Sequence, residues 1–296
     1  MLEQFVKRIE DKNVCVNSVV VFQGGKQIGE YDRIGSRTRL NTWSASKSFV
    51  SVGVGIAIDE GIMRLDEHLC DSFADYLPEN PSQNLLDITV HDMLTMTTGL
   101  ENPLFFTDDL YRLKIRDWVG HFFEANFPYM PGQQYLYSNF NTYMLSCMIE
   151  RKTGMKLVEY LRPRLFEKID IFSPEWMCDP MGRQTAANGL YLNIDEMAHF
   201  GLMLLGDGVY GGRRVVSREY LALATKAQTT LPGSKHGYGY QFWINPGGES
   251  YRADGKFGQY IFVLPTKDAV IAVMSLEGKK TGEIFHAVWE EIAEKL

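Results

Sequence analysis

Cysteine is scarce in this chain of 296 residues, and its four positions are widely separated. They are Cys15, Cys70, Cys147 and Cys178, and no CxxC pair occurs among them. A structural zinc site or a disulfide framework needs more closely patterned cysteines. We therefore expect small, buried, apolar cysteines, no metal and no cofactor, and the composition gives no reason to assume an oxidising compartment.

Positive charge is in deficit as well, because the formal net charge is −7 and no Lys/Arg-rich run occurs. This balance argues against a nucleic-acid-binding protein. The longest apolar run, Phe49 to Ile58, is too short to span a bilayer and indicates a buried helix. Residues 1–10 alternate charged and apolar side chains like an amphipathic helix, unlike a signal peptide. We expect a cytoplasmic protein that binds neither nucleic acid nor membrane; the sequence does not indicate its oligomeric state.

Several familiar catalytic motifs are missing. No Gly-x-Ser-x-Gly elbow, no His-Glu-x-x-His pair and no phosphate-cradling Gly-rich loop occurs. The histidines are dispersed along the chain, at His68, His91, His121, His199, His236 and His286. These absences disfavour an α/β-hydrolase elbow, a zinc peptidase and a nucleotide-binding loop.

The two ends of the chain have the composition of β-strands, whereas the middle is helical. The expected strands are Val14 to Phe22, Lys26 to Tyr31, Gly258 to Leu264 and Ala269 to Ser275. The expected helices are Val90–Thr97, Asp117–Ala125, Asn141–Arg151, Ile194–Leu205 and Gly282–Lys295. This order predicts an α+β fold in which both termini form one antiparallel sheet flanked by helices, with an inserted all-helical lobe. We expect a single catalytic domain over 1–296, with an α/β lobe of about 1–60 plus 185–296 and a helical lobe of about 61–184.

A candidate nucleophile, Ser44, is predicted in the first turn of the apolar helix. Ser44 and Lys47 are three residues apart, so a helical turn places the hydroxyl and the ammonium on one face. A serine needs a neighbouring base to become nucleophilic, and a lysine can serve if apolar surroundings lower its pKa. The N-terminus of the helix also favours negative charge developing near Ser44.

A second candidate group lies in the segment Pro131 to Asn139. Tyr137 and Asn139 alternate in an extended stretch, so both side chains can face the same side. A neighbouring ammonium would lower the pKa of Tyr137 and let the tyrosine help to move the serine proton. The similar string Tyr191-Leu-Asn193 is a decoy, because Asn193 has the context of a helix N-cap.

Together, Ser44-x-x-Lys47 and Tyr137-Ser-Asn139 resemble the active site of class C β-lactamases, serine DD-peptidases and their esterase and amide-hydrolase relatives. The similarity extends from about Val14 to the C-terminus, and it implies a β-lactamase/transpeptidase-like fold. Further segments that match this family are Gly55 to Asp66, Thr89 to Leu100, Gly189 to Asn193 and Phe200 to Leu205.

The family's third motif is a Lys-Thr-Gly, or a His-x-Gly variant, on a strand that lines the cleft. Two literal Lys-Thr-Gly strings occur, but Lys152–Gly154 ends a helix and Lys280–Gly282 opens one. The segment Gly255 to Gln259 most resembles the Gly-x-x-Gly-Gln form of 6-aminohexanoate-oligomer-hydrolase-like members. The resemblance implies substrate binding by Asn139, Lys256, Gly258 and Gln259, with the amides of Ser44 and Gln259 as an oxyanion hole. Lys256 can equally be a plain surface lysine.

The predicted function is a serine hydrolase in which Ser44 attacks a carbonyl of a small ester or amide, while Lys47 and Tyr137 manage the proton. Which of these two residues is the base stays open. A β-lactamase or penicillin-binding DD-peptidase is the alternative, although Phe257 puts conventional penicillin recognition in doubt; a sensor that binds without turnover is a second. Aromatic residues that could line an apolar acyl pocket are Phe105, Phe106, Tyr111, Phe127, Tyr129, Tyr238, Tyr240 and Trp243.

Overall fold

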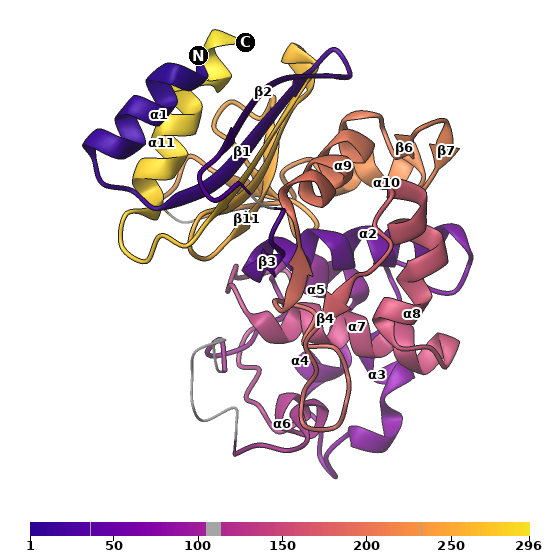
Figure 1. Ribbon diagram of the computed structural model, residues 1–296. Helices are drawn as coiled ribbons and strands as arrows, with labels where there is room; N and C mark the ends of the chain where they lie inside the picture. Colours follow the sequence, from indigo (N-terminus) through magenta and orange to yellow (C-terminus); the bar gives the residue numbers. More distant parts are fainter. Residues whose placement is uncertain (36, 105–113, 232) are drawn as a thin grey trace.

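The computed structural model describes residues 1–35, 37–104, 114–231 and 233–296. Within these ranges, an antiparallel sheet has the strand order β2-β1-β13-β12-β11-β10-β9-β8 (Figure 1). Its strands are β1 (Val16–Gln23), β2 (Lys26–Asp32), β8 (Thr229–Thr230), β9 (Gly237–Tyr238), β10 (Trp243–Ile244), β11 (Tyr251–Gly255), β12 (Gln259–Leu264) and β13 (Ala269–Ser275). The pairing of β1 with β13 joins the two ends of the chain inside one sheet, as the sequence predicts.

Both faces of the central strands are covered, because β13 is buried along its whole length. Helices α1 (Leu2–Asp11) and α11 (Thr281–Glu291) pack side by side on one face, where Figure 1 shows both chain ends. Helix α9 (Ile194–Leu205) lies against the other face. There a Cβ on Gly201 would come within 2.5 Å of the Val270 side chain, so glycine permits this close approach of helix and sheet.

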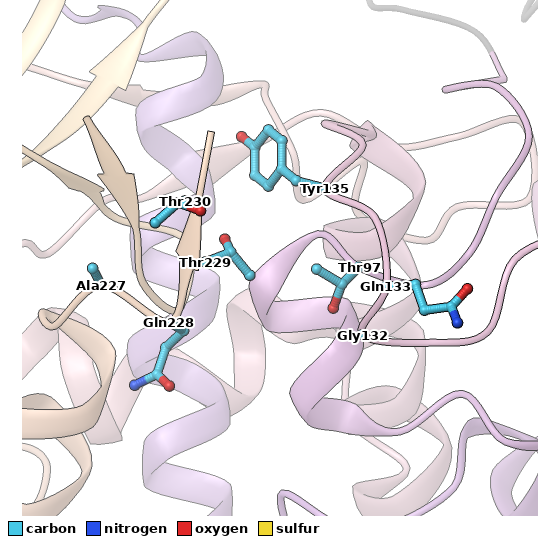
Figure 2. Close-up of a pocket in the computed structure, with 8 residues that line it drawn as sticks. All are labelled: Thr97, Gly132, Gln133, Tyr135, Ala227, Gln228, Thr229 and Thr230. Atoms are coloured by element: carbon cyan, nitrogen blue, oxygen red, sulfur yellow. The ribbon is translucent and has the colours of Figure 1, made fainter. Parts of the chain in front are cut away.

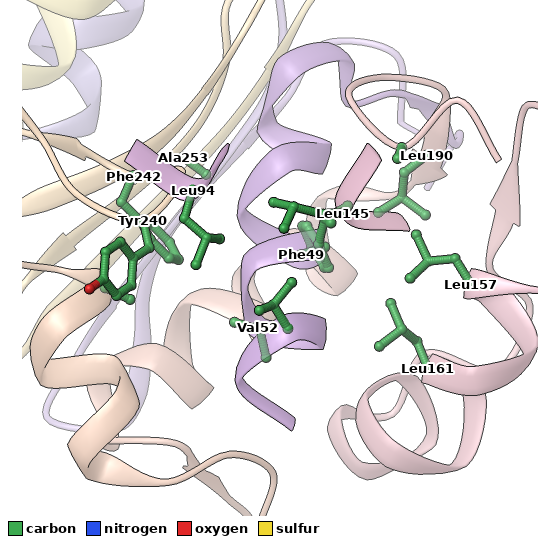
Figure 3. Close-up of a cluster of buried hydrophobic side chains, with 14 of the residues drawn as sticks. Phe49, Val52, Leu94, Leu145, Leu157, Leu161, Leu190, Tyr240, Phe242 and Ala253 are labelled. Atoms are coloured by element: carbon green, nitrogen blue, oxygen red, sulfur yellow. The ribbon is translucent and has the colours of Figure 1, made fainter. Parts of the chain in front are cut away.

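Helix α2 (Ser46–Asp59) runs through the larger hydrophobic core and is buried from Ser46 to Ala57. Figure 3 shows Phe49 and Val52 of this helix among side chains from several neighbouring elements. One of these is α7 (Asn139–Thr153), which contacts α2 directly. Figure 1 shows α2 among the helices below the sheet. The core therefore fixes the helix that follows the candidate nucleophile.

The remaining elements are short. The helices are α3 (Leu69–Ser72), α4 (Gln83–Leu86), α5 (Val90–Thr95), α6 (Trp118–Phe123), α8 (Leu157–Leu161) and α10 (Arg218–Ala224). The strands of two small sheets are β3 (Leu40–Asn41), β4 (Glu175–Trp176), β5 (Leu190–Leu192), β6 (Val209–Tyr210) and β7 (Arg213–Arg214). The division into two lobes stays a prediction.

Three sequence predictions about local structure need correction. Ser44 lies in a single 3₁₀ turn, Trp43–Ala45, and α2 begins only at Ser46. The strands β8 to β11 were not predicted from the sequence, because they are short and interrupted by glycine and charged residues. Of the four cysteines only Cys147 is buried, while Cys178 is exposed; all four are free thiols.

Candidate active site

The candidate nucleophile is presented by a strained turn. Trp43, immediately before Ser44, has φ 50°, a left-handed conformation that is costly for a bulky residue. The side-chain oxygen of Asn41 holds this turn by accepting from the amides of Trp43 (2.8 Å) and Gly189 (3.0 Å). Ser44 remains partly accessible at the end of the buried helix. A reacting carbonyl could therefore reach its hydroxyl.

Lys47 is enclosed beside Ser44, with only 1% of its surface exposed. Its Nζ lies 3.1 Å from Ser44 Oγ, 2.7 Å from Asn139 Oδ1 and 2.9 Å from the carbonyl oxygen of Ala187. Burial lowers the pKa of Lys47 well below that of a free lysine, because the charged form loses its hydration. The structure thus brings the serine and lysine together, as the motif predicts.

Tyr137 completes the cluster around the serine hydroxyl. Its ring centroid lies 4.8 Å from Lys47 Nζ. Burial raises the pKa of Tyr137, and a hydrogen bond with Ser44 acts in the opposite direction. The predicted lowering by a nearby ammonium is therefore wrong in sign, because loss of hydration is the larger effect here. The raised pKa favours the neutral phenol.

Asn139 begins α7, directly after the N-cap residue Ser138, whose hydroxyl accepts from the Phe140 amide at 3.1 Å. This start brings the Asn139 side chain across to α2, where its oxygen accepts from Lys47. The structure thus assigns Asn139 a contact with the lysine; its predicted contact with substrate stays a prediction. The decoy is confirmed as a cap, because Asn193 caps α9 in a reciprocal capping box with Glu196.

The third motif forms the tight turn between β11 and β12. A Cβ on Gly255 would lie 2.3 Å from the carbonyl oxygen of Thr42, so this glycine lets β11 pack against the nucleophile turn. Lys256 Nζ lies 5.9 Å from the Trp43 ring centroid and 5.2 Å from that of Phe257. The Phe257 and Trp43 rings meet edge to face at 4.9 Å. Lys256 is exposed at this rim, beside the nucleophile turn.

The other two residues of this motif point elsewhere. A Cβ on Gly258 would clash with Ile284 at 2.6 Å, so this glycine serves packing toward α11. Gln259 is fully buried, donates its side-chain amide to the Ser275 carbonyl and pairs with Gly255 across the turn. The predicted second oxyanion donor is the backbone amide of Gln259; this residue belongs to the pair between β11 and β12 rather than to the nucleophile turn.

Sequence reasoning missed two groups near the site. One is the Ala187 carbonyl, which lies on a loop where Ala186 and Gly189 have φ 62° and 83°. No side-chain pattern could have indicated it. The other is Asp254 on β11, whose charge raises the pKa of Tyr137 and which accepts from Arg252 Nε at 2.9 Å. Its place just before the Gly-x-x-Gly-Gln segment was the available signal.

The aromatic residues predicted to line an acyl pocket separate into groups. Trp243 stacks on Tyr137 at 5.9 Å, and Tyr238 meets Tyr137 edge-on at 6.2 Å. Tyr240 contacts His91 and Tyr220 instead, and Phe127 belongs to the hydrophobic core. Tyr129 is exposed. The predicted residues Phe105, Phe106 and Tyr111 lie outside the described residues.

The described parts of the chain contain neither a metal-binding cluster nor a membrane-spanning helix. No group of His, Cys, Asp or Glu side chains there could hold a metal ion. No helix there has the length and apolar character needed to cross a bilayer.

Comparison with known proteins identifies the family of this chain. The sequence model of the beta-lactamase family matches residues 4–289. The chain belongs to this family. It is a serine hydrolase of the β-lactamase-related type, as the resemblance in the sequence predicts, and it has the corresponding fold of helices around an antiparallel sheet.

Individual relatives carry hydrolase names. The chain is 26% identical over 302 residues to the 6-aminohexanoate-dimer hydrolase of Paenarthrobacter ureafaciens, covering 93% of this chain and 75% of that protein. A Bacillus anthracis structure described as a candidate 6-aminohexanoate-dimer hydrolase has a TM-score of 0.84 at 21% identity, covering 98% of this chain and 81% of that one. EstCE1, described as a hydrolase with promiscuous acyltransferase activity, has a TM-score of 0.75 at 14% identity, covering 97% and 99%. At these identities the two structures establish the fold alone.

Proposed function

We propose that this protein hydrolyses small esters or amides through an acyl-enzyme on Ser44. The observation that carries the proposal is the position of the buried Lys47 Nζ between Ser44 Oγ and two further oxygens. A buried lysine without a carboxylate against it is costly in a fold. Lys47 then serves as the base for the adjacent Ser44 hydroxyl.

The contacts of Lys47 support its role as that base. A neutral amine has two N–H groups and one lone pair. The oxygens of Asn139 and Ala187 can only accept hydrogen bonds, so they take both N–H groups. The lone pair then remains for the Ser44 O–H. After the proton moves, the ammonium has three N–H groups for the same three oxygens, so both protonation states are satisfied.

Tyr137 is suited to the second proton transfer. Its raised pKa favours the protonated phenol, and the phenol is hydrogen-bonded to Ser44. It can therefore give its proton to the departing alcohol or amine and regain one from the Lys47 ammonium. Water then attacks the acyl-enzyme with the same groups in reverse roles, so no net proton is consumed. Lys47 and Tyr137 act as one coupled system.

An oxyanion hole needs a second backbone amide beside that of the nucleophile. Peptide groups alternate sides along a strand. The Ser250 carbonyl accepts from the Asn245 amide at 2.9 Å, and Arg252 pairs with Trp243, so the even-numbered peptide groups of β11 face β10. Asp254 is the next even-numbered residue of β11. It lies beyond Arg252, whose pair with Trp243 is the last one toward that end of β10. We therefore propose its amide as the second donor.

The rim of the site favours small substrates that carry a carboxylate. Lys256 lies on the turn beside the nucleophile and adds a positive charge there. The Phe257 ring occupies the neighbouring space, against Trp43, which disfavours bulky bicyclic substrates such as β-lactams. The 6-aminohexanoate-dimer hydrolase relative is consistent with a linear amide that ends in a carboxylate.

Hydrolysis of p-nitrophenyl butyrate tests the proposal, with Ser44→Ala as the variant and Ser234→Ala, in an exposed loop, as the matched control. We expect sustained turnover by the wild type and the control, and its loss in Ser44→Ala. Intact mass after rapid quenching should show the butyryl adduct on the wild type and on the control, but not on Ser44→Ala. Equal activity in Ser44→Ala would disprove the nucleophile, whereas one stoichiometric burst without turnover would support the sensor.

A further inference from the structure

A polar pocket of about 320 Å³ lies beside Tyr135, two residues before Tyr137, and the proposed mechanism does not use it (Figure 2). Its walls come from the Gly132–Tyr135 loop, from Thr97 and from residues 227–230 around β8. None of the lining residues is charged. The pocket therefore offers hydrogen bonds but no counter-ion.

Two hydroxyl groups of this pocket are buried without a hydrogen-bond partner among the described residues. They are the phenol of Tyr135 and Oγ1 of Thr229. Figure 2 shows the Thr229 hydroxyl turned toward Tyr135. Buried polar groups in folded proteins are nearly always satisfied, so each exception calls for an explanation. A ligand group that accepts and donates hydrogen bonds would provide it.

A row of aromatic rings lies between the pocket and the candidate active site. Trp243, Tyr238 and Thr229 are direct cross-strand neighbours on β10, β9 and β8, so their side chains share one face of the sheet. Tyr137 stacks on Trp243 at 5.9 Å, and Tyr135 meets Tyr238 at 5.4 Å. One end of the row thus adjoins Ser44, and the other end adjoins the pocket.

We propose that this pocket binds an uncharged hydrogen-bonding group, an amide or a hydroxyl, carried by the substrate's acyl chain. The proposal rests on the function proposed above, since it places that group relative to the acyl-enzyme. Tyr135 and Tyr137 are two positions apart in the chain, so their Cα atoms are at most about 7 Å apart, and this distance sets the scale of the acyl chain between Ser44 and the pocket. A charged group is disfavoured, because it would lose its hydration without gaining an opposite charge. Tyr135 and Thr229 are then specificity-determining residues.

Binding to Ser44→Ala protein tests the pocket independently of catalysis. Calorimetry would compare methyl 6-acetamidohexanoate with methyl nonanoate, which has the same chain length but no amide. We expect Tyr135→Phe and Thr229→Val, each added to Ser44→Ala, to reduce the affinity ratio of the two esters about three- to tenfold. Tyr240→Phe, a buried tyrosine away from the pocket, should keep the ratio.

The outcomes separate the two proposals. Both pocket substitutions are nearly isosteric and remove a hydroxyl without a described partner, so thermal denaturation should show intact folds. An unchanged affinity ratio in both variants would disprove ligand binding in the pocket. Water would then be the hydrogen-bond partner of the two hydroxyls. A lowered ratio supports it, even if wild-type protein hydrolyses neither ester. In that case the proposed function would fail and the pocket would stand.

Discussion

Two regions of the protein are filled with different groups: the terminal layer, formed by the two chain ends, and the junction around Ser44, where Ser44 itself stays partly accessible. Between α1, α11 and the sheet, the buried cluster consists of apolar side chains such as Phe5, Ile271 and Val288. At the junction, Lys47 is buried together with polar groups from distant parts of the chain. The first arrangement stabilises the fold, whereas the second buries the amine that we propose as the base.

The junction is held by polar contacts that the terminal layer does not need. Gln241 is an example: its side chain donates to the carbonyls of Met93 and Leu94, at 3.0 and 2.9 Å, and accepts from Thr142 at 2.6 Å. Its own carbonyl accepts from the Ser48 hydroxyl at 2.8 Å. One residue thus ties α2, α5 and α7 together behind the nucleophile. In contrast, the ion pairs of Arg8 with Glu283 and Glu290 lie at the partly exposed rim of the terminal layer and contribute little.

The largest effect is expected at the junction, from Lys47→Met. Loss of the base should reduce kcat/KM for p-nitrophenyl butyrate by about 10²- to 10⁴-fold. The proposed mechanism uses the neutral amine of Lys47, so kcat/KM should fall as the pH falls through the lowered pKa of Lys47. The rise of kcat/KM with pH, measured between about pH 6 and pH 10, should therefore be absent from the variant. Lys26→Met, at an exposed position, is the control. If kcat/KM still rose with pH in Lys47→Met, the titrating group would be a residue other than Lys47.

The terminal layer should show the opposite behaviour in Ile271→Ala. This side chain is fully buried on β13, so its truncation should reduce the free energy of unfolding by about 2–5 kcal/mol. The folded fraction should keep its kcat, because the substitution lies in the cluster beneath α1 and α11. Urea denaturation measures the loss, with Ile28→Ala, 46% exposed on β2, as the matched control. A reduced kcat in fully folded Ile271→Ala would show that the two regions are coupled.

The smallest effect is expected at the rim, from Lys256→Met. Its exposed charge should matter only for anionic substrates, by about two- to fivefold in kcat/KM. The measurement compares the mono-p-nitrophenyl ester of succinic acid with p-nitrophenyl butyrate, at low salt and at 1 M salt. The difference should shrink at high salt because the charge is screened. Exposed Lys279→Met should leave the comparison unchanged; an equal loss for both esters would indicate a packing role for Lys256.

The sequence predicts the terminal layer well, because a strand buried on both faces is an unbroken apolar run and an amphipathic helix has a clear period. It also pairs Ser44 with Lys47, since their spacing on a helical turn is local. It could not predict the Ala187 carbonyl, which contributes no side-chain signal and lies 140 residues from Lys47. It erred on Tyr137, because the sign of a pKa shift depends on burial, which is a tertiary property. The remaining site residues stay predictions that the proposed substitutions test.

The pairing of β1 with β13 has a consequence for how the enzyme is made. Synthesis produces β1 and the Ser44 turn early, but β1 waits for a partner more than 200 residues later, since Val19 pairs with Val273. The strand β11, which packs against the nucleophile turn, also comes late in the chain. During translation the helices can compact first, while the sheet and the site stay unfinished. The growing chain therefore carries its serine and lysine for most of synthesis without an assembled hydrolytic centre.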